Sequence, residues 1–208
     1  MPVPFWKTMH MEINRIQKIS RFRSRFPSAL AALVPTPEFA LGVTLSAHDD
    51  ALAGIHFLPA DTVPVAAQTP LAREVVHQLT AWLLDARFVF DLPTVTQGTP
   101  FQQRVWALIS AIPPGETRSY GELAAILGTA PRPVGAACGA NPLPLVVPCH
   151  RVLARDGTLG GFARERSGFL LDIKRTLLAH EQAVREKHTA KIGDSPEGRG
   201  FKPELVLR

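Results

Sequence analysis

The chain has 208 residues, of which 46% are hydrophobic and 20% are charged, and its net charge is +5 at neutral pH. This composition is that of an ordinary globular protein of one medium or two small domains, with no apolar run near the roughly 18 residues of a membrane span. Two cysteines exclude a disulfide framework, and the first residues lack the blocks of a secretory signal, so we expect a cytoplasmic protein.

Residues 1–37 are predicted to be a basic, disordered extension. Residues 1–26 contain six basic side chains and one acidic side chain, and the segment ends in proline-rich Val34 to Pro37. A segment this poor in acids also leaves a transit peptide or a DNA-contacting arm open as alternatives.

Residues 38–94 predict a small α/β domain. Phe39 to Ser46 and Ala51 to Leu58 are expected strands, and Thr69 and Pro70 are a typical helix start. The helix that follows carries one apolar face, which needs a sheet to cover it: Leu71, Val75, Val76, Leu79, Trp82 and Leu83. With two basic and seven acidic side chains in residues 27–94, this domain shows no chemistry of its own.

Residues 95–185 predict a second, helical domain that faces a polyanion, because residues 95–181 hold nine basic and six acidic side chains. Thr99-Pro100 starts one helix, and Ser119 with Glu122 forms a capping box that starts another. The helix that starts at Ser119 and the small-residue helix from Pro131 to Ala140 together form a helix-turn-helix candidate. A strand from Leu145 to Pro148, a closing helix from Phe169 to Glu181 and a polar tail over residues 186–208 complete the predicted order.

Cys149 and His150 are the candidate catalytic pair. A free thiol has a pKa of about 8.5, so a nucleophilic cysteine needs a neighbouring base. His150 is adjacent, Glu181 is a possible partner that orients it, and the charge of Arg151 favours the thiolate. From these residues alone, an inert buried cysteine and a thiol hydrolase remain open. A metal site is disfavoured, because Cys138, Cys149 and His150 lack the paired spacing of zinc ligands.

The run Asn141-Pro-Leu-Pro-Leu-Val-Val-Pro-Cys-His-Arg-Val152 closely resembles the active-site signature of the O6-alkylguanine-DNA alkyltransferases. The resemblance is specific and spans about residues 96–183, with further matching segments at 98–106, 112–116, 119–124, 160–162 and 177–181. It implies an α/β (α+β) fold: a ribonuclease-H-like N-terminal domain at residues 38–94 and a winged-helix-like alkyltransferase domain with the helix-turn-helix at 95–185. It implies DNA repair by single-turnover transfer of an alkyl group from the O6 of guanine to a cysteine, with the O4 of thymine as a further candidate source of the group.

The resemblance also implies a role for each matching residue. Cys149 would accept the alkyl group, His150 would act as its base through a water, and Glu181 would hold the imidazole. Asn141 would tie the recognition helix to the active-site segment, and Tyr120 would donate a proton to the departing guanine. Arg132 would fill the space left by the flipped nucleotide. Further residues are implied as DNA contacts (Tyr120, Pro133, Gly135, Ala136 and Arg151) and as the substrate pocket (Pro144, Val152, Phe162 and Ala163).

The implied partner is double-stranded DNA that contains alkylated guanine, bound through its minor groove by a monomer with no cofactor, metal or membrane. We expect such a protein in the cytoplasm or on the nucleoid. A module that binds lesions without repairing them is the competing hypothesis. Phe162 and Ala163 replace the tyrosine and serine of many relatives, the turn before Arg132 is short, and Pro133 stands where alanine is common.

Overall fold

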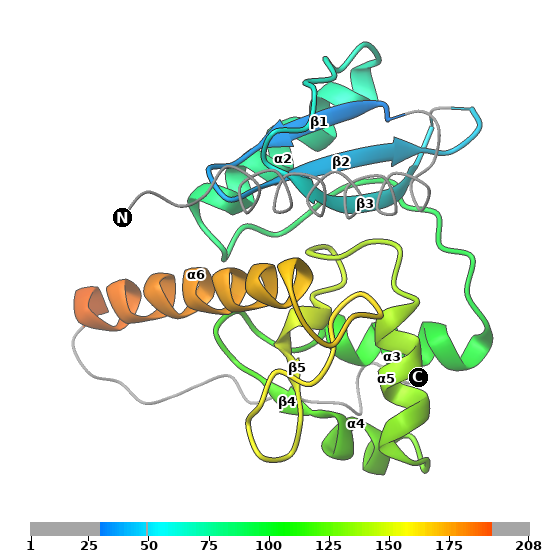
Figure 1. The fold of residues 1–208 in the computed structure, drawn as a ribbon, viewed down its shortest axis with the longest axis vertical. Coiled ribbons are helices and arrows are strands. Elements are labelled where there is room, and N and C mark those ends of the chain that lie inside the picture. The colour runs from blue at the N-terminus through cyan, green and yellow to red at the C-terminus, as the bar shows by residue number, and fades with distance from the viewer. Residues whose placement is uncertain (1–29, 49, 193–208) are drawn as a thin grey trace, which may run out of the picture.

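The computed structural model describes residues 30–48 and 50–192, and the side chains as far as residue 183. The first part is a three-stranded antiparallel sheet with a helix packed against it (Figure 1). The strands β1 (Ala32–Pro35), β2 (Phe39–Leu45) and β3 (Leu52–Pro59) lie in that order, and α2 (Pro70–Leu84) contacts β1 and β2. Two of the strands and the helix are confirmed predictions.

The strand β1 corrects the prediction that residues 1–37 are disordered. Ala32 and Val34 are buried in the core beneath α2, whereas Leu33 is buried with Leu58 on the other face of the sheet. This alternation is what a strand with two covered faces requires, and β1 pairs with β2 from Ala32 to Pro35. Residues 1–29 of the predicted extension lie outside the described residues.

The second part contains three short helices, α3 (Pro100–Ser110), α4 (Tyr120–Ile126) and α5 (Pro131–Gly139). Their starts follow from the sequence, because Thr99 and Ser119 accept hydrogen bonds from the backbone amides three residues on and both helices have complete capping boxes. The contact between α4 and α5 confirms the predicted helix pair, with Gly128 in the turn between them at φ +64°.

Two predictions fail near the candidate cysteine and at the chain end. Residues 145–148 form turns rather than a strand, since Leu145 has a left-handed φ of 78°, and a 3-10 turn η1 (Cys149–Arg151) follows. The strand lies just beyond, where β5 (Val152–Leu153) pairs in parallel with β4 (Arg118–Ser119). The helix α6 (Phe169–Ile192) continues through residues 186–192, which were predicted as tail, and residues 193–208 lie outside the described part.

The two parts share one hydrophobic core, and α6 runs between them (Figure 1). A backbone hydrogen bond of 2.9 Å from Ile55 on β3 to Pro142 also joins them. Among the described residues, no helix has the length and apolarity needed to cross a bilayer.

Candidate active site

Cys149 begins the turn η1 and is buried, with 5% of its surface exposed. Asn141, just after α5, donates from Nδ2 to Cys149 Sγ at 3.3 Å and to the carbonyl of Val147 at 2.8 Å. Its Oδ1 accepts from the amide of Leu143 at 3.0 Å. Asn141 therefore links the end of the helix-turn-helix to the turn that carries the thiol, in the place predicted for it.

His150 and Glu181 form a buried pair behind the thiol. His150 Nε2 lies 2.8 Å from Glu181 Oε1, and both side chains are at most 1% exposed. The carboxylate also accepts a hydrogen bond of 3.0 Å from the amide of Gly115. The distant glutamate thus lies where the sequence predicted an orienting group.

The network fixes the proton positions. Burial alone would raise the pKa of the Glu181 carboxyl, but the hydrogen bonds from His150 and Arg151 and the positive charge of Arg151 outweigh it and hold this pKa at about 2. Burial lowers the pKa of His150, so its imidazole is neutral. A carboxylate only accepts hydrogen bonds, so Nε2 carries the imidazole proton. The basic nitrogen is then Nδ1, which is buried and has no hydrogen-bond partner in the described protein.

The thiol of Cys149 needs such a base. Burial raises its pKa, an effect that the hydrogen bond from Asn141 and the charge of Lys174 oppose in part. The resting group is therefore a thiol, and a nearby neutral imidazole is the chemistry that makes it nucleophilic.

Arg151 occupies a different place from the one predicted. It is 5% exposed, donates to both oxygens of Glu181 at 2.8–3.1 Å and also donates to the carbonyl of Ile112. The prediction that it contacts DNA is wrong, because the buried carboxylate of Glu181 requires a buried cation as a partner.

Lys174 on α6 is a buried group that the sequence analysis missed. It is fully buried, and its Nζ donates to the carbonyls of Val152, Leu159 and Gly161 at 2.7, 2.6 and 3.2 Å. Burial lowers its pKa to about 8. Lys174 therefore holds the segment after Cys149 and the 159–161 loop together. The only signal in the sequence is its place on the inward face of the closing helix, beside Ile173.

A cavity of about 940 Å³ opens between α5, the 160–166 loop and Cys149. Eight of its lining residues were singled out from the sequence: Tyr120, Arg132, Gly135, Ala136, Cys138, Cys149, Phe162 and Ala163. Seven of the predicted site residues do not line it: Asn141, His150, Arg151 and Glu181, whose places are given above, and Val152, Pro133 and Pro144. Val152 is fully buried, Pro133 is exposed on the first turn of α5, and Pro144 lines a neighbouring hollow of about 440 Å³.

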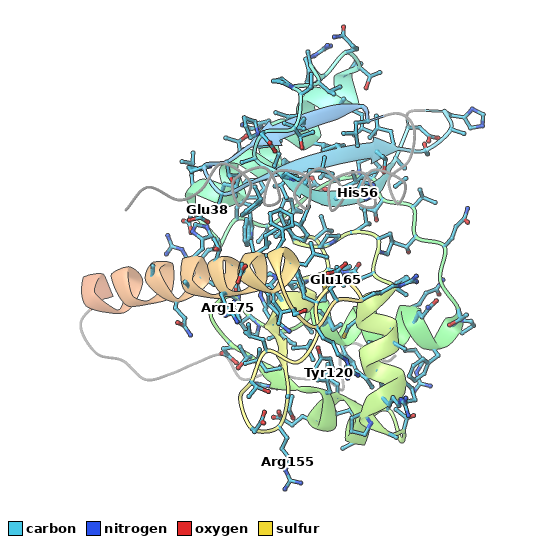
Figure 2. All side chains as sticks on the ribbon, in the orientation of Figure 1. Glu38, His56, Tyr120, Arg155, Glu165 and Arg175 are labelled. Atoms are coloured by element: carbon cyan, nitrogen blue, oxygen red, sulfur yellow. The ribbon has the colours of Figure 1, made fainter. Side chains whose placement is uncertain are left out.

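Tyr120 forms one wall of this cavity. Figure 2 shows it within the molecule, whereas Arg155 projects outward into solvent. Its hydroxyl donates to the carbonyl of Gly161 at 3.2 Å, and burial raises the pKa of the phenol, so the proton stays on. Gly160 has φ +63° and a Cβ there would lie 3.1 Å from the Tyr120 ring, so glycine permits this close packing.

The opposite rim is a tight turn from Phe162 to Glu165, closed by two backbone hydrogen bonds. Its central residues Ala163 and Arg164 both have left-handed φ values, 47° and 70°, which residues other than glycine rarely adopt. Arg164 Nε donates to the carbonyl of Gly139 at 3.1 Å and so ties the turn to α5. The buried ring of Phe162 packs against Phe57 of β3 with ring centroids 5.4 Å apart.

Cys138 on α5 is the second free cysteine and lines the same cavity. Burial raises the pKa of its thiol, and in the described part of the chain no base is hydrogen-bonded to it. The described ranges also hold no cluster of three or more histidine, cysteine, aspartate or glutamate side chains that would suit a metal ion.

Comparisons with known proteins agree with this geometry. Residues 100–183 match the family model described as 6-O-methylguanine DNA methyltransferase, DNA binding domain. A constitutive methylated-DNA–protein-cysteine methyltransferase of Bacillus subtilis is 43% identical over 113 residues, which cover 52% of this chain and 68% of that protein. A methylated-DNA–protein-cysteine methyltransferase of Salmonella typhimurium is 53% identical over 92 residues, covering 43% of this chain and 51% of that protein.

A solved structure extends the likeness to the N-terminal part. The Mycobacterium tuberculosis OGT in complex with DNA superposes with a TM-score of 0.58 at 36% identity, covering 73% of this chain and 92% of that one. The sequence motifs and the mixed helix-and-sheet fold agree with these relatives, and the matches cover most of the length of the Bacillus subtilis protein and of the solved structure. The chain belongs to the 6-O-methylguanine DNA methyltransferase family.

Proposed function

We propose that this chain repairs DNA by transferring a methyl or larger alkyl group from the O6 of guanine to Cys149. The observation that carries the proposal is the buried thiol with a neutral His150 and an ionised Glu181 behind it, at the wall of a cavity of about 940 Å³, which is large enough to admit a nucleobase. Relatives named methylated-DNA–protein-cysteine methyltransferases support the same reaction.

The proposed step is an in-line displacement. His150 Nδ1 takes the thiol proton through a bridging water, and Cys149 Sγ attacks the alkyl carbon. A sulfur–carbon bond forms as the bond from that carbon to the guanine O6 breaks, and the leaving guanine takes a proton at its ring nitrogen from Tyr120. The thiol proton replaces the one that Tyr120 gives up, so atoms and charge balance. A thioether is a poor leaving group, so the chain is consumed in one turnover.

The proposed substrate enters as a flipped nucleotide. An alkyl group on O6 is buried in the duplex, and extruding the base costs a few kcal/mol. Arg132 is exposed at the start of α5 beside the cavity and would occupy the vacated space. The small residues Gly135 and Ala136 let α5 approach a narrow groove, which supports minor-groove binding by a monomer. O4-alkylthymine would meet the same thiol.

The finer architecture is also part of the proposal. The sheet β1–β3 with α2 would correspond to a ribonuclease-H-like unit, and α4 and α5 with the β4–β5 pair to a winged-helix-like unit. Residues 38–94 and 95–185 are the proposed domain bounds, with β1 now added to the first.

The test is a titration of duplex that carries radiolabelled O6-methylguanine with increasing amounts of the chain. The expected end point is one methyl transferred to protein per active chain, with no further release on longer incubation. Tight binding without methyl loss would instead favour a lesion-recognition module. Release of many methyl groups per chain would instead indicate a thiol hydrolase, which should also act on a methylated substrate that is not part of DNA.

A further inference from the structure

The hydrogen bond to Glu181 holds His150 at one atom only. With Nε2 at 2.8 Å from Oε1 and the ring attached to the backbone through Cβ, the imidazole can still rock about its Cβ–Cγ bond, and this motion changes the direction in which Nδ1 points. The proposed reaction needs Nδ1 to point toward the water that carries the thiol proton of Cys149. A second contact must therefore fix the plane of the ring.

That contact comes from the N-terminal part of the chain. The indole of Trp82, in the last turn of α2, lies edge-to-face with the imidazole of His150, with ring centroids 6.1 Å apart and planes at 74°. Both side chains are at most 1% exposed. Aromatic rings prefer this edge-to-face arrangement, and a close-packed ring restricts the rotation of its neighbour.

Trp82 is itself held by α6. The ring of His180 packs against the indole with centroids 5.1 Å apart, and His180 Nε2 lies 3.1 Å from the carbonyl oxygen of Trp82. This carbonyl belongs to the last turn of α2, where carbonyls have no partner within the helix. His180 precedes Glu181, so adjacent residues of α6 fix the carboxylate and the tryptophan that define the imidazole position.

We propose that Trp82 is a positioning residue for the transfer reaction, through which the N-terminal sheet-and-helix unit completes the catalytic base. In this role it touches neither DNA nor the thiol and acts through the orientation of His150. The inference rests on the proposed function, and it gives the N-terminal unit a part in catalysis.

The test compares Trp82→Phe, Trp82→Leu and Trp82→Ala in the full chain, by single-turnover transfer from O6-methylguanine duplex at saturating concentration. The matched control is Leu41→Ala, which opens the same core at a fully buried residue of β2. The expected result is a saturated rate lowered about tenfold or more in Trp82→Leu and Trp82→Ala. Trp82→Phe should recover most of that rate, while the Kd for duplex stays within about twofold in every variant.

Three results would overturn the positioning role: a wild-type saturated rate in Trp82→Leu, no recovery in Trp82→Phe relative to Trp82→Leu, or an equal loss in Leu41→Ala. Trp82→Leu keeps an apolar side chain without the ring, so it decides the question if Trp82→Ala does not fold. No transfer by the wild-type chain in the same assay would refute the proposed function itself, a separate outcome from any of these.

Discussion

His150 Nε2 and Glu181 Oε1 lie 2.8 Å apart although 31 positions separate them in the chain. The contact joins the turn η1 to the last helix and sets the polarity of the imidazole, with the proton on Nε2 and the free base on Nδ1.

The ionised Glu181 stabilises the folded chain above about pH 4.5. Its folded pKa of about 2 lies below the ordinary value of 4.5, so this stability is lost as the pH falls from 4.5 toward 2. The shift corresponds to about 3 kcal/mol. We expect Glu181→Gln to be less stable than wild type by about that amount at pH 7, and the gap to close in acid. Urea unfolding at pH 7, 5 and 3 measures the difference in the free energy of unfolding between the two proteins. A difference that does not change with pH would contradict an ionised Glu181 with a lowered pKa.

Alkyl transfer should follow the titration of His150 at low pH. Burial lowers the pKa of His150 below its ordinary value of 6.5, and only the neutral ring accepts the thiol proton. The saturated single-turnover rate should therefore remain above half its plateau at pH 6.5 and fall at lower pH. Measurement below pH 7.5 keeps Lys174, whose pKa is about 8, protonated throughout. A midpoint above pH 6.5 would rule out a neutral buried base.

Two arginines that look alike in the sequence should behave differently. Arg132 is exposed beside the cavity, so Arg132→Ala should weaken duplex binding and reduce the salt-dependence slope by about 1. Arg151 is buried against Glu181, so Arg151→Met should leave that slope unchanged and lower the free energy of unfolding by about 3 kcal/mol. Fluorescence anisotropy at several salt concentrations, with urea unfolding, separates the two. A reduced slope in Arg151→Met would restore it as a DNA contact.

Lys174 should matter for the pocket despite its distance in sequence from Cys149. Lys174→Met keeps most of the unbranched side chain but leaves three carbonyls without their donor, at a cost of at least about 2 kcal/mol. We expect a lower melting temperature and slower transfer. Arg175→Met is the control, because Arg175 is the next residue on α6 and, among the residues that the structure describes, makes only an exposed ion pair with Asp172. Equal stability of the two variants would show that the buried ammonium does not hold the loop.

The sequence predicts the local elements well where caps mark them. Thr69, Thr99 and Ser119 each accept the amide bond expected of a helix cap, and the helix-turn-helix follows from the last of these with the glycine-bearing turn. The strand β1 escaped notice because four residues between an arginine-rich and a proline-rich stretch carry little pattern of their own. These four residues form a strand because they pair with the neighbouring strand β2.

Burial of charge is what the sequence does not reveal. Arg151 and Lys174 were expected at the surface or were not considered, since both residue types are seldom buried. They are buried because Glu181 and three backbone carbonyls provide partners that come together only in the folded chain. The turn at residues 145–148 shows the same limit, because an apolar run predicts burial without fixing the backbone conformation.

The most direct measurement is the mass of the intact chain, with peptide mapping, after incubation with excess O6-methylguanine duplex. The proposed function predicts a gain of about 14 Da, the mass of one added CH₂, on the peptide that contains Cys149. It also predicts no gain in Cys149→Ser. A methyl group on Cys138, or repaired DNA beside an unmodified Cys149, would contradict it.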